Sequence, residues 1–297
     1  MRIVLWALLL GAALPASAAL NVFACTPEWG ALAREIGGER ATVYTATTAQ
    51  QDPHRIEARP SLIARARSAD LLVCTGAQLE IGWLPLVQSQ SGNPKILPGQ
   101  PGYFEAAAHV ALLDKPARVD RAAGDVHPAG NPHIHLDPRN VAKIADALAQ
   151  RMAKLDPAEA AHYSARATSF RERWREATVR WEREAGPLKG VPLVVYHRNF
   201  TYMIHWLGMR EVGNLEPNPG LPPTTGHLST LLANLRQVPA KAIVRTAYND
   251  PRAAEWLAER AGIAAVVLPY TVGGTPAAKD LFALYDDTLA RMLAAIR

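Results

Sequence analysis

The sequence predicts an α/β protein of two lobes, each a parallel sheet flanked by helices, joined by one long rigid connector helix. Short apolar segments alternate with helical segments in the first half, as in a parallel sheet covered on both faces. The alternation stops at a long amphipathic segment and restarts after it. We therefore divide the chain into a signal peptide (1–18), a first lobe (19–156), the connector (157–186) and a second lobe (187–297).

The first eighteen residues have the pattern of a secretory signal peptide. Arg2 provides a positive start, residues 3–14 an apolar run, and residues 16–18 a small-residue cleavage site. The apolar run is too short for a membrane-spanning helix. We expect cleavage after Ala18 and export to the periplasm.

Composition narrows the class of protein further. The chain has 297 residues, 49% of them hydrophobic, and a formal net charge of +5. No basic stripe with interleaved aromatic residues is present, which argues against nucleic acid as a partner. The two cysteines, Cys25 and Cys74, are too few for a metal site of several thiolates. Export permits their oxidation, so a disulfide and a pair of buried free thiols both fit the sequence.

In the first lobe we expect strands at residues 20–25, 42–47, 70–74 and 95–98. The third is a continuous apolar run, typical of a strand buried on both faces. Prolines indicate where helices begin, at Pro27, Pro60 and Pro138. Residues 99–130 are irregular, with one short strand expected near residues 109–113.

The connector is predicted from a stripe of apolar residues between Pro157 and Gly186. Its members recur at spacings of three and four, which places them on one helical face; they are Tyr163, Ala167, Phe170, Trp174, Ala177 and Trp181. Such a helix is roughly 40 Å long at 1.5 Å per residue, longer than one small lobe needs. An ordinary amphipathic core helix is the alternative.

The second lobe repeats the style of the first. We expect strands at residues 191–196, 242–245 and 264–268. Helices are expected at residues 203–207, 225–237, 251–262 and 280–296. No repeat is detectable in the sequence itself, so the predicted similarity is architectural.

Three of the nine histidines share a context. His54 follows an Asp-Pro pair beyond the second strand, His133 follows Asn-Pro ahead of a helix, and His197 ends the strand at residues 191–196. Neutral imidazole is a preferred ligand for zinc and its neighbours. Ligands of open parallel sheets bind outside the carboxyl ends of the strands. The three histidines therefore predict a metal pocket between the two halves.

These motifs resemble the zinc/manganese group, cluster A-I, of ABC-transporter solute-binding proteins. The resemblance rests on Asp52-Pro53-His54 with Pro60, Ala69-Asp70-Leu71-Leu72-Val73, Leu79-Glu80 before Trp83, Asn131-Pro132-His133 through Asp137-Pro138, and Tyr196-His197. It covers essentially the whole mature chain. It implies a rigid connector between two lobes and carries the family's metal-ligand roles over to His54, His133 and His197.

Other candidate ligands remain open. His135 stands where the family more often has an aromatic residue, so it is either a substituted packing residue or a further ligand. His127 either assists metal capture from its loop or is a surface histidine. Asp280 is the acidic candidate for the fourth ligand, with a helix N-cap as its alternative role and water as the alternative ligand. The family's acidic residue after the last strand is replaced here by the segment 270–274.

Three imidazoles and one oxygen form a tetrahedral site that suits Zn²⁺, whereas Mn²⁺ prefers more oxygen ligands. The resemblance thus implies a monomeric, non-catalytic periplasmic protein that delivers Zn²⁺ to a membrane ABC permease. A periplasmic metallochaperone is a further candidate partner. The alternatives are a Mn²⁺-binding transport protein, a metal-dependent adhesin and, with less support, a zinc hydrolase. The hydrolase lacks support because no His-Glu-x-x-His segment is present.

Overall fold

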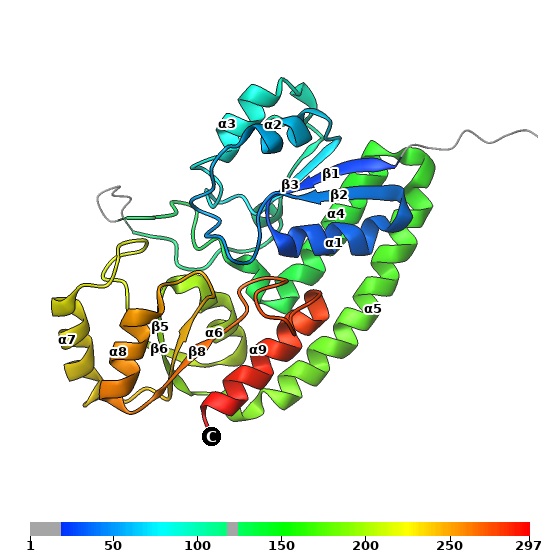
Figure 1. The fold of residues 1–297 in the computed structure, drawn as a ribbon. Coiled ribbons are helices and arrows are strands. Elements are labelled where there is room, and N and C mark those ends of the chain that lie inside the picture. The colour runs from blue at the N-terminus through cyan, green and yellow to red at the C-terminus, as the bar shows by residue number, and fades with distance from the viewer. Residues whose placement is uncertain (1–18, 118–123) are drawn as a thin grey trace, which may run out of the picture.

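The computed structural model describes residues 19–117 and 124–297, so the expected signal peptide lies outside the described residues. Two four-stranded sheets, each parallel throughout, form the framework (Figure 1). The first has the order β2-β1-β3-β4 and the second β6-β5-β7-β8. Their strands are β1 (Leu20–Ala24), β2 (Ala41–Thr45), β3 (Leu71–Cys74), β4 (Tyr103–Glu105), β5 (Pro192–Val195), β6 (Arg210–Asn214), β7 (Ala242–Arg245) and β8 (Ala264–Val267). The equivalent strand order confirms the predicted α/β architecture of two similar halves.

Helices connect and cover these strands. They are α1 (Pro27–Gly37), α2 (Pro60–Arg67), α3 (Leu84–Ser91), α4 (Pro138–Leu155), α5 (Ala160–Glu184), α6 (Thr201–Leu207), α7 (Thr225–Leu235), α8 (Pro251–Ala261) and α9 (Leu281–Ala295). Five of them carry proline in the first turn, where its missing N–H costs no helical hydrogen bond. Within the described ranges, no helix is both long enough and apolar enough to cross a membrane.

The central strands of the first sheet, β1 and β3, bury side chains on both faces of the sheet, with alternate side chains pointing in opposite directions. The face toward α1 and α4 presents Val22, Ala24, Leu71 and Val73. The face toward α2 and α3 presents Phe23, Cys25, Leu72 and Cys74. This double burial explains the continuous apolar run of β3.

The second sheet repeats this arrangement. Its face toward α7 and α8 presents Val194, Tyr196 and Ile243. Its other face presents Leu193, Val195, Ala242 and Val244 to the core that also contains α6 and α9. That core is continuous with the α1 and α4 side of the first sheet. One apolar core therefore spans both halves of the molecule.

Helix α5 passes along both halves (Figure 1). It begins at Ala160, after a 3-10 turn at Pro157–Glu159, and its 25 residues extend roughly 37 Å. All six residues of the predicted apolar stripe are buried. The Trp174 indole donates to the carbonyl of Pro138 in α4, and Trp181 stacks on Tyr285 of α9 with 4.6 Å between ring centroids. Helix α5 thus packs against α4 of the first half and α9 of the second half.

Three strand predictions differ from the structure. Residues 95–98 are not a strand, because Pro94–Ile96 form a 3-10 turn in which the Asn93 side chain accepts from the backbone of Lys95. The fourth strand of that sheet is β4, eight residues later. The strand expected near residues 109–113 is replaced by a 3-10 turn at Ala106–His109. Strand β6 was not predicted, since its sequence Arg-Glu-Val-Gly-Asn is polar and contains glycine.

Cys25 and Cys74 form a disulfide with 4.9 Å between their Cα atoms. The pairing follows from the sheet, because β1 and β3 are neighbours and the backbone N–H of Cys25 donates to the carbonyl of Val73. Of the two states that the sequence allowed, the structure has the disulfide. Both half-cystines are fully buried.

Candidate metal centre

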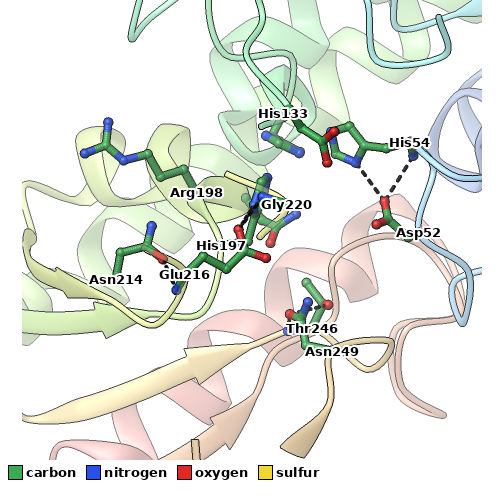
Figure 2. A network of polar contacts seen from close by, with 12 residues as sticks. Asp52, His54, His133, His197, Arg198, Asn214, Glu216, Gly220, Thr246 and Asn249 are labelled. Carbon is green, nitrogen blue, oxygen red and sulfur yellow. Dashed lines mark hydrogen bonds and ion pairs between the residues drawn. The ribbon is translucent and has the colours of Figure 1, made fainter. Parts of the chain in front are cut away.

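His54, His133 and His197 converge between the two halves (Figure 2). One ring nitrogen from each lies within 4.8 Å of the other two. Centroid distances between the three rings are 5.4 to 5.6 Å. The loop after β2 provides His54, the segment before α4 provides His133, and the end of β5 provides His197. The structure therefore brings together the three histidines that the sequence singled out.

His54 and His133 are held by the same local device. In each, the side-chain oxygen of the residue two positions earlier accepts from both the backbone N–H and the ring Nδ1 of the histidine. For Asp52 Oδ1 these distances are 3.0 and 2.7 Å. For Asn131 Oδ1 they are 3.0 and 2.8 Å. The intervening proline fixes its φ, so an Asx-Pro-His sequence orients the ring and favours the tautomer that has its proton on Nδ1.

His197 receives the same support from a distant residue. Its Nδ1 lies 2.6 Å from Oε2 of Glu216, in the loop after β6 (Figure 2). A carboxylate can only accept, so Nδ1 carries the proton and Nε2 keeps its lone pair. Hydrogen-bond acceptors on Nδ1 commonly orient metal-binding histidines. Glu216 carries no signal in the sequence, because the histidine that it contacts is nineteen positions away.

His133 has a buried ring nitrogen with a free lone pair. The amide of Asn131 donates to the Arg198 carbonyl, which leaves its oxygen to accept from His133. His133 is 1% exposed, and its Nε2 atom is buried without a hydrogen-bond partner among the described residues. A buried polar atom without a partner is costly, so this lone pair is available to a ligand that binds between the rings.

The protonation states of His133 and Asp52 favour the binding of a positive ion. Burial, reinforced by the neighbouring His197 and His54, holds the pKa of His133 well below its usual value. At neutral pH His133 is therefore uncharged, as a metal ligand must be. Burial acts to raise the pKa of Asp52, but its hydrogen bonds with His54 outweigh burial and lower it. The carboxylate is thus ionised beside the imidazoles.

His127 also lies at this centre. Its Nε2 atom is 3.2 Å from Nε2 of His54, and their ring centroids are 5.3 Å apart. It lines a pocket of about 310 Å³ together with His133 and His197. Burial and the nearby His54 lower the pKa of His127 to about 4. His127 was expected as an accessory or surface residue, and the structure places it beside a candidate ligand.

His135 occupies a different, fully buried position. Its Nε2 donates to the carbonyl of Tyr270 at 2.8 Å, and its Nδ1 lies 3.7 Å from Oε1 of Glu28. The ring also packs edge-on against Trp29 and Tyr270. These contacts place the His135 ring between α1 and the segment after β8.

Asp280 serves as the N-cap of α9. Its Oδ1 accepts from the backbone N–H of Ala283 at 2.8 Å, which was the alternative role for this residue. Among the described residues, its carboxylate is not in the group of ligand atoms that gather at the three histidines. The buried ring of Tyr270 packs against His133 instead, with 5.7 Å between centroids.

The sequence and the fold are both similar to those of known periplasmic metal-binding proteins. The family model described as ZnuA, zinc-uptake complex component A, periplasmic, matches residues 22–297. The high-affinity zinc uptake system protein ZnuA of Paracoccus denitrificans is 25% identical over 98% of this chain and 95% of its own. A crystal structure of ZnuA superposes with a TM-score of 0.77 at 19% identity, covering 94% of this chain and 100% of that one. The Mn-bound periplasmic metal-binding protein of Candidatus Liberibacter asiaticus gives 0.75 at 16%, with the same coverage.

Proposed function

The chain belongs to the family of periplasmic zinc-uptake components, and we propose that it captures Zn²⁺ between its two halves and delivers the ion to a membrane ABC permease. The family comprises metal-binding proteins of ABC transporters and not enzymes. The observation that carries the proposal is the convergence of three imidazoles whose Nδ1 atoms are all engaged by acceptors. Each ring then offers Nε2 to one cation.

Zn²⁺ is proposed over Mn²⁺ because of this ligand chemistry. Zinc sites are commonly tetrahedral and rich in imidazole, whereas manganese favours carboxylate and water oxygens. The proposed ligands are His54, His133 and His197. Asp280 is not retained in this set, because its carboxylate caps α9. The relative from Paracoccus, named a zinc uptake protein, supports zinc.

Manganese transport is the second candidate. The structurally similar protein from Candidatus Liberibacter asiaticus is Mn-bound, so the shared fold accommodates either ion. Asp52 stands beside His54 and could contribute an oxygen to a larger coordination sphere. The count of nitrogen donors nevertheless favours zinc for this chain.

Delivery is proposed to involve small movements of the two lobes, 19–156 and 187–297, about the connector at 157–186. One apolar core joins both halves along α5. A buried hydrogen bond between Thr271 and Glu28, 2.5 Å long, links the segment after β8 to α1. Wide hinge opening would break both. We also propose cleavage after Ala18, a monomeric state, docking on a permease and loading by a metallochaperone.

Metal titration tests the proposal. We expect the purified mature protein to bind one Zn²⁺ with high affinity and Mn²⁺ far more weakly, measured by competition with a fluorescent chelator. His54→Ala, His133→Ala and His197→Ala should each weaken zinc binding strongly, because each removes a ligand. His205→Ala, at an exposed position of α6, is the matched control. Wild-type affinity in all three variants would refute the site.

A further inference from the structure

His127 lies on a segment of the first half that contacts the second half, residues 124–130, here termed the strap. The backbone N–H of Asp125 donates to the carbonyl of Pro219 at 2.8 Å. Arg55 lies 3.6 Å from the Asp125 carboxylate and donates to the carbonyl of Gly220 at 2.9 Å. These contacts tie the strap to the loop after β6, so the position of His127 is built by both halves.

Two glycines allow the close contact between the strap and the loop after β6. Gly124 has a φ of +90°, and a Cβ there would lie 2.0 Å from the Pro219 carbonyl oxygen. Gly220 has a φ of +75°, and a Cβ there would lie 2.1 Å from the Asp125 carboxylate. Each backbone would therefore be pushed away by any side chain. The close approach requires glycine on both sides of the contact.

The spacing between His127 and His54 fits a shared metal ion. In a tetrahedral zinc site with Zn–N distances of 2.0–2.1 Å, neighbouring nitrogens are roughly 3.3 Å apart. The observed Nε2–Nε2 distance is 3.2 Å. His127 lies outside the group in which one nitrogen from each of His54, His133 and His197 is within 4.8 Å of the other two, so binding an ion shared by all four rings requires a movement of the His127 ring toward them. Because Nδ1 of His54 donates to Asp52, Nε2 of His54 has a lone pair directed at this position. Two imidazole nitrogens this close must share either a proton or a cation.

A second observation points to a ligand at the same place. Nε2 of His133 is buried and has no hydrogen-bond partner among the described residues. His127, His133 and His197 line one pocket of about 310 Å³. An ion in this pocket would satisfy the His133 nitrogen that the protein leaves unpaired.

We propose that His127 is the fourth metal ligand, so that this chain binds its ion with four imidazoles and no carboxylate. The inference rests on the proposed function, since it completes the same site. An all-nitrogen sphere disfavours Mn²⁺, which prefers oxygen ligands. The strap would thereby make this chain more selective for zinc than a three-histidine site with a carboxylate.

The test compares His127→Ala with wild type and the control His205→Ala, each confirmed to be folded by circular dichroism. X-ray absorption of the zinc-loaded proteins should show four imidazole ligands in wild type and in the control, and three in His127→Ala. Zinc affinity should fall by at least the ~10- to 100-fold typical of lost supporting residues around a metal. Manganese affinity should fall less, so the Zn/Mn affinity ratio should decrease.

Two outcomes overturn the inference in distinguishable ways. If His127→Ala keeps the wild-type ligand count and affinity while His54→Ala loses zinc, His127 is not a ligand and the proposed function stands. If His54→Ala, His133→Ala and His197→Ala also bind zinc like wild type, the proposed function fails with it.

Discussion

Oε2 of Glu216 lies 2.6 Å from Nδ1 of His197, although the two residues are nineteen positions apart. The same oxygen accepts from the backbone N–H of Gly220 at 2.8 Å. Glu216 therefore orients a candidate metal ligand and also fixes the loop that contacts the strap. One carboxylate thus connects His197 to the segment that presents His127.

Removing this carboxylate should weaken metal binding. We expect Glu216→Ala to lower zinc affinity by about 10- to 100-fold, the usual effect of losing a group that orients a histidine ligand. Glu216→Gln should lose less, because the amide oxygen can accept both hydrogen bonds without the charge. Chelator competition measures both, and Glu259→Ala, at a largely exposed carboxylate, provides the control. Equal affinity in Glu216→Ala and wild type would contradict the assigned role.

The local parts of the site could be predicted from the sequence. Asp52-Pro53-His54 and Asn131-Pro132-His133 each contain the ligand and the acceptor that orients it, within three residues. Such contacts depend on short stretches of chain, which a sequence displays directly.

The nonlocal parts could not be predicted. Glu216 reaches His197 only because β6 pairs with β5, and β6 is a short polar strand without a recognisable pattern. The approach of His127 to His54 likewise depends on the strap meeting the loop at Gly220. For Asp280, sequence allowed a ligand or a helix cap, and the structure shows the cap.

The hydrogen bond from Thr271 to Glu28 should contribute to stability. The Glu28 carboxylate is fully buried, and it accepts from Thr26 at 2.6 Å and from Thr271 at 2.5 Å. We expect Thr271→Val to lower the free energy of unfolding by about 1.5–3 kcal/mol, as for hydrogen bonds to charged groups. Denaturant unfolding measures this loss. Thr168→Val, at an exposed position of α5, should change stability little, and an equally small effect in Thr271→Val would show that the bond contributes nothing.

The disulfide closes a loop that contains both Asp52 and His54. Its 49-residue separation predicts, from chain entropy, a contribution of about 4 kcal/mol to the free energy of unfolding. The double variant Cys25→Ala/Cys74→Ala should lose about this much. A reducing agent should destabilise wild type and leave the double variant unaffected. If the reductant instead has no effect on wild type, the disulfide does not form in solution.

Buried Glu80 should make stability depend on pH. Its carboxylate accepts from the backbone N–H groups of Thr75 and Gly76 at 2.8 and 3.1 Å, next to a turn in which Ala77 and Gln78 have positive φ. Burial, with a smaller contribution from the charge of Glu28, raises the pKa of Glu80 from 4.5 to about 7. Between these values the folded protein holds a proton that the unfolded chain releases.

Stability contributed by this group is therefore complete below pH 4.5 and decreases as the pH rises to about 7. The free energy of unfolding of zinc-free wild type minus that of Glu80→Gln should decrease with pH over this interval, by at most about 1.4 kcal/mol per pH unit. Denaturant unfolding of both proteins at several pH values measures the difference. Titrations elsewhere largely cancel in it, because they are common to both chains. The exposed Glu57→Gln is the control. A constant difference for Glu80→Gln over this interval would mean that Glu80 is ionised throughout.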